Sequence, residues 1–349
     1  MRLTKKSAVA DFLHKSIKIA RFLLRLSLIC LFVLCYYHYM KVKDLDFSDN
    51  PLILAPMAGV SDVGFRSLAA SFGADATVTE MLSARAMAHN PKKTALMTIT
   101  TDAEKIKIAQ IFGHEEEYMK NAIQSPMLEK FDSFDINMGC PAPKIVKNGE
   151  GGALMDDLIL AGKIIYACKN ATSKPLSVKF RKGHKKENFL EFARMCEDNG
   201  ADFVTFHART VGQGYSGHAD YEAIAQVKAQ LHIPVVGNGD VVDAKSLQEM
   251  KATGVDGVMI GRGTMGRPWL FAELKDPGMK VDKYEVAKKH VEILRKFYEE
   301  DWLKLYIRKH LLWYTKDMAM SANLRLKLAT CEDIDECLGI MKDAFKLNV

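Results

Sequence analysis

The chain has 349 residues, 48% of them apolar and 26% charged, a composition that excludes fibrous and disordered classes and allows one large α/β domain with a smaller one. The net charge of +6 would suggest a nucleic-acid partner, but residues 1–40 hold seven of the 49 basic residues and one of the 43 acidic residues, so the rest of the chain is neutral. The seven cysteines form no CxxC pair and no cluster at zinc-ligand spacing. They indicate a reducing compartment, hence the cytoplasm, and no bound metal.

The first 39 residues form a basic and apolar leader. Basic residues precede an uncharged run over 26–40, LSLICLFVLCYYHYM, which is shorter than the roughly 20 residues that span a bilayer. Three interpretations stay open. Translation starts at Met40 and the leader is an upstream artefact, or residues 22–25 extend the run into an N-terminal membrane anchor, or the leader is a signal peptide without a small-residue cleavage site.

From Leu52 onward, short apolar runs alternate with amphipathic stretches. The runs predict strands over 52–57, 76–79, 106–112, 134–138, 176–180, 203–207, 235–237 and 257–260. The stretches between them predict helices over 62–72, 115–124, 159–171, 186–199, 219–230 and 244–253. Eight such units predict a closed (β/α)8 TIM barrel over residues 40–279. An open doubly wound sheet is the alternative, disfavoured because no GxGxxG opens the first helix.

Polar or conformationally special residues follow every predicted strand. They are Pro56 and Met57, Glu80, Gln110, Asn137 to Cys140, Lys179, His207 to Arg209, Asn238 to Asp240, and Gly261 to Gly263. The carboxyl ends of barrel strands form the active-site face, so this series predicts a site there. The last two loops, NGD and GRG, suit a phosphate held by backbone amides and by Arg262, although glycines that only make tight turns would give the same pattern.

The segment 135–155, DINMGCPAPKIVKNGEGGALM, carries the most specific pattern. A buried strand ends in Gly-Cys-Pro and continues into a loop rich in glycine, proline and lysine, which is typical of a strand that delivers a side chain to a site. Cysteine alone is more often a small core residue. Asn137, Lys144 and Lys147 make the surroundings of Cys140 polar, which favours a functional thiol.

Residues 280–349 lose the strand signals and predict a small C-terminal helical domain with an excess of basic residues. Arg308, Lys309 and His310 lie next to Trp313 and Tyr314, a combination that suits phosphate contacts and base stacking. A solvated helix face with a buried tryptophan explains the same residues. A second basic cluster, RKGHKK over 181–186, follows the fifth strand on the active-site face. Two such patches suit a polyanionic substrate.

The chain resembles the tRNA-dihydrouridine synthase family, with most similarity to the bacterial B-type enzymes. The segments that carry the resemblance are APMAGVSDVGFR (55–66), EM (80–81), QIFG (110–113), the 135–155 segment, SVKFRKG (177–183), FHARTVGQGYSGHADY (206–221), VVGNGDV (235–241), GVMIGRGTMGRPWLF (257–271) and RKHLLWY (308–314). They cover nearly the whole chain after Met40, and the leader has no counterpart in the family.

This resemblance implies an FMN-dependent barrel that reduces uridine in tRNA to dihydrouridine with NADPH, with tRNA bound by the helical domain. By position, Cys140 would protonate C5 of the uracil while reduced flavin delivers hydride to C6. The residues implied to hold FMN are Ala55, Pro56, Met57, Gln110, Lys179, His207, Asn238, Gly239, Asp240, Gly261 and Arg262. Those implied on the substrate side are Asn137 and Arg209, with Arg308, Lys309 and His310 toward tRNA. No obligatory protein partner is implied.

The chemistry agrees with these placements on independent grounds. A thiol with an ordinary pKa of about 8.5 is mostly protonated at neutral pH and can donate a proton. A lysine beside a flavin stabilises negative charge on the reduced ring. A uridine must leave its stack to reach a buried site. Two other hypotheses stay open: a dihydroorotate-type dehydrogenase, which has the same cofactor and in some forms an N-terminal membrane segment, and an RNA-binding barrel without redox activity.

Overall fold

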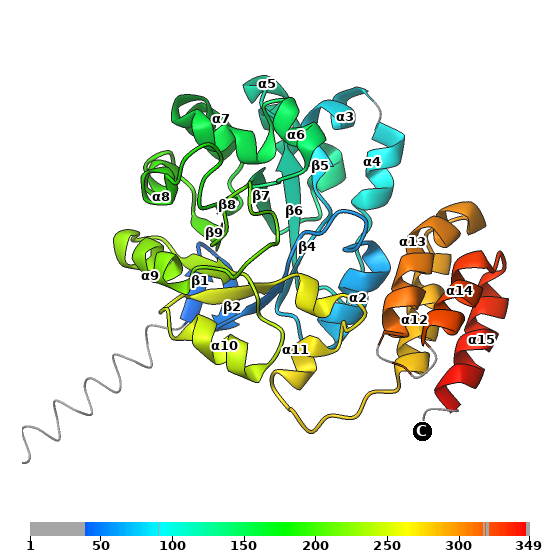
Figure 1. Ribbon diagram of the computed structural model, residues 1–349. Coiled ribbons are helices and arrows are strands. Elements are labelled where there is room, and N and C mark those ends of the chain that lie inside the picture. The colour runs from blue at the N-terminus through cyan, green and yellow to red at the C-terminus, as the bar shows by residue number, and fades with distance from the viewer. Residues whose placement is uncertain (1–38, 90, 317, 319–320, 347–349) are drawn as a thin grey trace, which may run out of the picture. The chain divides into compact units, whose positions relative to one another are not determined.

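The computed structural model describes residues 39–349 except 90, 317, 319–320 and 347–349, so the expectations for the leader lie outside the described residues. Eight parallel strands form a closed barrel (Figure 1). They are β3 (Leu52–Leu54), β4 (Ala76–Val78), β6 (Ile106–Phe112), β7 (Ser133–Met138), β8 (Leu176–Arg181), β9 (Phe203–His207), β10 (Val235–Asn238) and β11 (Gly257–Ile260). The barrel closes where β11 pairs with β3, Val258 opposite Leu52. The predicted barrel is confirmed, and the open sheet is wrong.

The helices that cover the barrel lie where the amphipathic stretches predict them. They are α2 (Val63–Ser71), α5 (Glu116–Ile123), α7 (Leu158–Asn170), α8 (Phe189–Asp198), α9 (Tyr221–Gln230) and α10 (Ala244–Lys251). Asp62, Asp157, Asp220 and Asp243 cap four of these helices by accepting a backbone N–H with the side chain. Their apolar faces and the strands form one continuous core.

Short elements that the apolar pattern did not predict occupy the connections. They are β5 (Leu82–Ser83), α3 (Ala84–His89), α4 (Pro91–Met97), α6 (Pro143–Lys147), α11 (Leu270–Glu273) and the 3-10 turns Pro126–Leu128, Gly151–Asp156 and Arg262–Thr264. The first three lengthen the connection between β4 and β6, so the β5 strand pairs with β6 beside the barrel. The 3-10 turn at Gly151–Asp156 shapes the loop that follows Cys140.

A two-stranded sheet covers the amino ends of the barrel strands. It consists of β1 (Tyr39–Val42) and β2 (Leu45–Asp49). Met40, Val42 and Phe47 are buried in a cluster with Ile53 and with residues that begin other strands. The ring of Phe47 meets that of Phe203 edge to face at 5.7 Å between centroids. This cover leaves the carboxyl ends as the face where a site can form.

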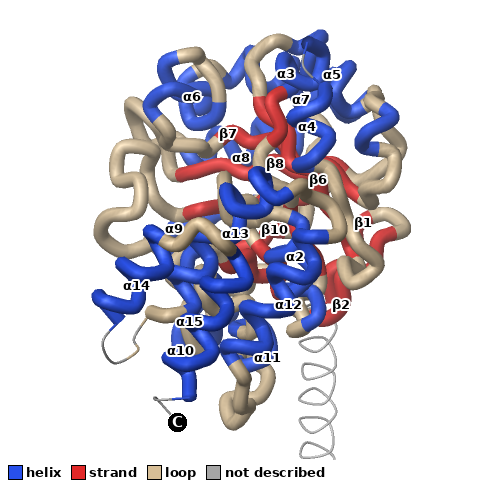
Figure 2. The backbone as a smooth tube through the Cα atoms, turned by 90° about the vertical axis from the view of Figure 1, so that its right-hand side faces the viewer, coloured by secondary structure: helices blue, strands red, loops and turns tan. Residues whose placement is uncertain are grey.

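Four helices complete the chain: α12 (Lys283–Arg295), α13 (Glu300–Tyr314), α14 (Ser321–Thr330) and α15 (Ile334–Lys346). The two views show them gathered beside α2 (Figures 1 and 2). Their apolar residues form a core that also contains Val63 and Leu68 of α2. The helical segment is confirmed, and its treatment as a separate domain from residue 280 stays a prediction. Within the described part of the chain, no helix combines the length and apolarity needed to cross a bilayer.

Candidate active site

A cavity of about 1030 Å³ opens at the carboxyl ends of the barrel strands. This volume suits a ligand the size of a cofactor with part of a substrate. Most of the residues singled out by sequence line it: Ala55, Pro56, Met57, Gln110, Asn137, Cys140, Lys179, His207, Asn238, Gly239, Asp240, Gly261 and Arg262. They lie on or directly after seven of the eight strands, so the closure of the barrel alone brings them together.

Cys140 lies in a tight turn after β7, and its half-buried side chain lines the cavity. The side-chain oxygen of Asn137 accepts hydrogen bonds from the backbone N–H groups of Gly139 and Cys140, at 3.2 and 2.9 Å. The carbonyl of Cys140 accepts from the N–H of Gly152 at 3.0 Å. A Cβ on Gly151 would lie 2.9 Å from the Cβ of Cys140, and Gly151 has φ +58°. The glycines of this loop therefore permit its close approach to the thiol.

The thiol of Cys140 is held in its protonated form. Burial raises its pKa, although the positive charges of Arg181 and Lys179 act in the opposite direction. Arg181 is itself fixed, because its Nη1 donates to the carbonyls of Thr210 and Gly214 at 3.1 and 2.7 Å. A protonated thiol beside fixed cations can give up a proton to a substrate atom.

A chain of side-chain hydrogen bonds supports this turn from inside the barrel. The amide nitrogen of Asn137 donates to the side-chain oxygen of Gln110 at 2.9 Å, and the amide nitrogen of Gln110 donates to Asp135 at 2.6 Å. The hydroxyl of Ser177 donates to the other oxygen of Asp135 at 2.5 Å. Burial raises the pKa of Asp135 to about 6, so its carboxylate is mostly ionised at neutral pH.

Lys179 brings a cation from β8 to the cavity. Its Nζ donates to the side-chain oxygen of Asn238 at 2.8 Å, and the amide of Asn238 donates to the carbonyl of Met259 at 2.8 Å. Burial and the neighbouring guanidinium of Arg181 lower the pKa of Lys179 to about 7. An amine with this pKa is only partly protonated at neutral pH. A negative charge nearby would raise its pKa and favour the protonated form.

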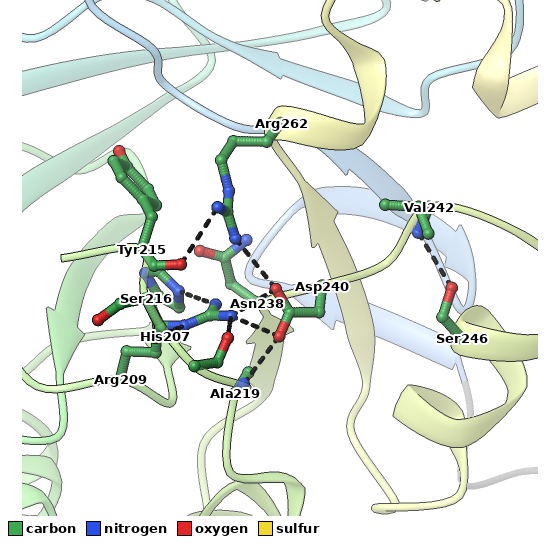
Figure 3. Close-up of polar contacts among 12 residues, drawn as sticks. His207, Arg209, Tyr215, Ser216, Ala219, Asn238, Asp240, Val242, Ser246 and Arg262 are labelled. Atoms are coloured by element: carbon green, nitrogen blue, oxygen red, sulfur yellow. Dashed lines mark hydrogen bonds and ion pairs between the residues drawn. The ribbon is translucent and has the colours of Figure 1, made fainter. Parts of the chain in front are cut away.

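His207, Arg209 and Asp240 form a polar network at the cavity wall, in which His207 and Asp240 line the cavity and Arg209 lies behind them (Figure 3). The Nη2 of Arg209 donates to both oxygens of Asp240 at 2.7 and 2.6 Å and to the carbonyl of Gly217 at 2.7 Å. Its Nε donates to the carbonyl of Ser216, and its Nη1 lies 3.3 Å from the Nε2 of His207. Burial and the surrounding cations hold the pKa of His207 far below its ordinary value. The imidazole is therefore neutral, and Nε2 accepts from Arg209.

The loops after β10 and β11 form a cradle that suits a phosphate. A Cβ on Gly239 would lie 2.6 Å from the Cβ of Ala219, and one on Gly263 would lie 2.5 Å from the carbonyl oxygen of Val241. Arg262 is fixed beside them, because its Nη2 donates to Asp240 at 3.0 Å while its guanidinium lies 4.6 Å from the ring centroid of Tyr215 (Figure 3). Glycine-lined backbone with one oriented guanidinium fits the phosphate of a cofactor such as FMN.

Arg209 and His310, which the resemblance placed toward the substrate, do not line the cavity. Arg209 is only 1% exposed, is absent from the cavity lining, and uses its donors within the loop 209–217 and on Asp240. His310 is fully buried, so its imidazole has no face to offer a nucleic acid. The sequence around His310 does not show which of its basic and aromatic residues are buried, because the residue types are the same in a buried and in an exposed cluster.

Arg308 and Lys309 are half-buried on α13. Arg308 donates to the carbonyl of Cys331 at 2.8 Å. The Nζ of Lys309 lies 5.3 Å from the ring centroid of Tyr306 and 3.0 Å from the point where a Cβ on Gly59 would stand. Lys309 thus lies beside the first loop of the active-site face, and contact with tRNA stays a prediction for both residues.

His310 instead joins the C-terminal helices to the barrel. Its Nε2 lies 2.9 Å from one oxygen of Asp62, and the Nε2 of His290 lies 3.3 Å from the other. Asp62 also caps α2, and the hydroxyl of Tyr314 lies 3.0 Å from the Nδ1 of His290. The three residues are close enough to hold a metal ion, but each nitrogen that faces Asp62 already bonds to it, so the contacts describe a hydrogen-bonded network.

The structure adds two residues to the site that the sequence did not single out. Tyr215 lines the cavity, and Asp135 lies directly behind it. Arg181, predicted only as part of the basic cluster over 181–186, also lines the cavity. Asp135 could have been found from its position, because it lies two residues before Asn137 on a strand and so shares its face. Tyr215 lies inside the HARTVGQGYSG motif, but nothing in the motif indicates that its ring meets Arg262.

Comparison with known proteins places the chain among tRNA-modifying enzymes. A profile of the family described as dihydrouridine synthase (Dus) matches residues 53–349. The chain is 36% identical over 309 residues to tRNA-dihydrouridine synthase B of Proteus vulgaris, covering 85% of this chain and 96% of that protein. It is 35% identical over 302 residues to a probable tRNA-dihydrouridine synthase of Rickettsia conorii, covering 82% and 90%. A probable tRNA-dihydrouridine synthase of Mycobacterium tuberculosis H37Rv is 37% identical over 311 residues, covering 82% and 80%.

Proposed function

Because the chain belongs to the dihydrouridine synthase family, we propose that it reduces uridine in tRNA to 5,6-dihydrouridine, with FMN as its flavin and NADPH as the reductant. The observation that carries the proposal is the shared cavity of Cys140, Lys179 and Arg262. The cavity thus holds a proton donor (Cys140), an amine that a nearby negative charge would protonate (Lys179) and a guanidinium beside the phosphate cradle (Arg262). Reduction of the uracil C5–C6 bond needs a hydride at one carbon and a proton at the other, and bound FMN would supply the hydride.

The residues of the chain divide the remaining tasks. Arg262 and the loops at Gly239 and Gly263 would hold the cofactor phosphate, and Asp240 keeps the guanidinium aimed at it. Lys179 and Gln110 would hold the polar edge of the flavin ring. A negative charge there would favour the protonated form of Lys179. Ala55, Met57 and Met259 offer apolar contacts to the ring.

Cys140 would protonate C5 of the uracil. Its pKa is raised by burial, so the thiol carries its proton at neutral pH, and the hydrogen bonds that the N–H groups of the turn donate to Asn137 fix its backbone. After the transfer the fixed guanidinium of Arg181 stabilises the thiolate. Tyr215, 56% exposed and held beside Arg262, stands at the mouth, where a uridine turned out of its stack would enter.

The rest of the tRNA would lie across the mouth of the barrel, and we place the protein in the cytoplasm with it. Lys185 and Lys186 of the 181–186 cluster are exposed and follow Arg181, which lines the cavity. On α13, Lys309 lies near the loop at Gly59, and Arg308 is its neighbour in sequence. Contacts to the phosphate backbone would position the tRNA, while the cavity selects the base. We assign His310 no contact with tRNA, because its side chain is fully buried.

The test is the dihydrouridine content of tRNA in cells that lack the protein, compared with cells complemented by the wild type or by Cys140→Ala. The proposal expects one or more tRNA positions to lose dihydrouridine, to regain it with the wild type, and not to regain it with the variant. Purified protein should be yellow. Colourless protein that takes up no FMN, together with unchanged tRNA, would instead favour an RNA-binding barrel without redox activity.

A further inference from the structure

The hydrogen bonds that link Asp135 to Cys140 through Gln110 and Asn137 are all donated toward Asp135. An ionised carboxylate only accepts hydrogen bonds, so the amide nitrogen of Gln110 must face Asp135, as it does at 2.6 Å. The oxygen of Gln110 then faces Asn137 and accepts from it at 2.9 Å. The oxygen of Asn137 is left for the backbone N–H of Cys140, at 2.9 Å. The carboxylate of Asp135 accepts at the inner end of this chain, and the backbone N–H of Cys140 donates at the outer end, so both ends require the same orientation of the two amides.

We propose that Asp135 is a positioning residue for the reaction, because it fixes the orientation of the Gln110 and Asn137 amides and through them the turn that carries Cys140. The inference rests on the proposed function, since it assigns Asp135 to the acid of that reaction. Asp135 does not line the cavity, so it acts through its neighbours.

Burial makes this orientation strict. Asp135 is 2% exposed and Gln110 is 1% exposed, so an amide nitrogen left without an acceptor there carries a desolvation penalty. If residue 135 could not accept, Gln110 would turn or withdraw to find another partner. Either movement removes the acceptor that holds the nitrogen of Asn137, and the turn at Cys140 loses its support.

A second role for Asp135 has to be separated from this one, because its charge also acts on Lys179. Asp135→Asn removes the charge but can keep an oxygen toward Gln110, with its amide nitrogen toward the hydroxyl of Ser177. Asp135→Leu has a similar size and no acceptor. Thr205→Val is the matched control, because the Thr205 hydroxyl is buried on β9 and has no partner among the described residues.

Two rates are measured on the whole protein. The first is alkylation of Cys140 by iodoacetamide, followed by mass spectrometry of its peptide with and without FMN. The second is dihydrouridine formation in a single turnover with reduced enzyme and unmodified tRNA. For Asp135→Leu we expect alkylation to rise about threefold as the turn loosens, and the turnover rate to fall about tenfold or more. Asp135→Asn and Thr205→Val should stay within about twofold of the wild type in both.

A compensating pair tests the same idea if Asp135→Leu does not fold. Gln110→Glu places a second carboxylate against that of Asp135. Adding Asp135→Asn restores the pairing in reverse: the amide nitrogen of residue 135 donates to the carboxylate of residue 110, which still accepts from Asn137. Cys140 alkylation should change about threefold in Gln110→Glu and return to within about twofold of the wild type in the double variant. Equal rates in the single and double variants would overturn the proposal.

The remaining outcomes are also decisive. A folded Asp135→Leu protein with wild-type rates would overturn the proposal, and so would an Asp135→Asn protein as impaired as Asp135→Leu, because the charge would then matter and not the acceptor. Failure of the proposed function is distinguishable: the wild type would then form no dihydrouridine, while the alkylation rates would still separate the variants.

Discussion

Replacement of Gly64 by alanine tests the contact between the barrel and the C-terminal helices. Gly64 lies in α2, where its missing side chain lets α12 approach. A Cβ there would lie 2.5 Å from Cδ2 and 2.8 Å from Nε2 of His290, and 2.9 Å from a methyl of Leu294. His290 is fully buried between Asp62 and Tyr314, so the ring has no free space in which to retreat.

The size of the effect follows from competing contributions. Alanine favours a helix over glycine by about 1 kcal/mol. Against this, the imidazole must move by roughly 0.9 Å to reach an ordinary contact, and overpacking of this kind costs about 1–3 kcal/mol. Displacing His290 from Asp62 costs about 1 kcal/mol more. We expect Gly64→Ala to lower the free energy of unfolding by about 1–3 kcal/mol in total.

Gly339 provides the matched control. It also lies inside a helix, α15, but a Cβ there meets no atom within 4 Å. Gly339→Ala should therefore stabilise the chain by up to about 1 kcal/mol. Urea denaturation and thermal melting of both variants measure the difference. If Gly64→Ala stabilised the protein as much as Gly339→Ala does, the packing of α12 on α2 would not be as described.

Three further outcomes follow from the site and its supports. Burial lowers the pKa of His310 from 6.5 to about 4, so between these values the unfolded chain binds more protons, and the free energy of unfolding should fall by about 3 kcal/mol as the pH drops through that window. His310→Asn should lack this part of the decline in pH-dependent melting, and an unchanged curve would refute the assignment. Alkylation of Cys140 should have its midpoint above pH 9.0, because burial raises the pKa of the thiol; a midpoint below it would contradict the acid role. Arg262→Gln should weaken FMN binding about tenfold or more in a fluorescence titration. Arg194→Gln should not, because Arg194 is exposed on α8 and does not line the cavity. Equal affinities of Arg262→Gln and the wild type would show that Arg262 does not hold the phosphate.

The barrel was predictable because each strand is a short apolar run followed by glycine, proline or a polar residue. The same rule located the site, since parallel strands in a barrel share one carboxyl end. The two-stranded sheet of β1 and β2 escaped prediction, because the run from Tyr39 to Asp49 mixes charged and apolar residues and only packing on Ile53 and Phe203 explains its burial. Elements as short as β5 and α3 leave too few residues for a period to be recognised.

The role of His310 was not predictable from the chain. Its neighbours Arg308, Lys309 and Trp313 have the composition of a nucleic-acid contact, and that composition does not change when one member turns inward. Its partner Asp62 is 248 residues away in sequence. The local pattern identified Asp62 only as the start of a helix. The hydrogen bond between Asp62 and His310 could therefore be seen only in the folded structure.

The most direct measurement of the central claim is dihydrouridine formation in a single turnover, using pre-reduced enzyme and unmodified tRNA, for the wild type and Cys140→Ala. We expect the wild type to form dihydrouridine, and the variant to bind FMN and tRNA normally but to form dihydrouridine at least about 100-fold more slowly. A variant as fast as the wild type would show that Cys140 is not the acid, and a wild type that forms no dihydrouridine on any tRNA would contradict the proposed function itself.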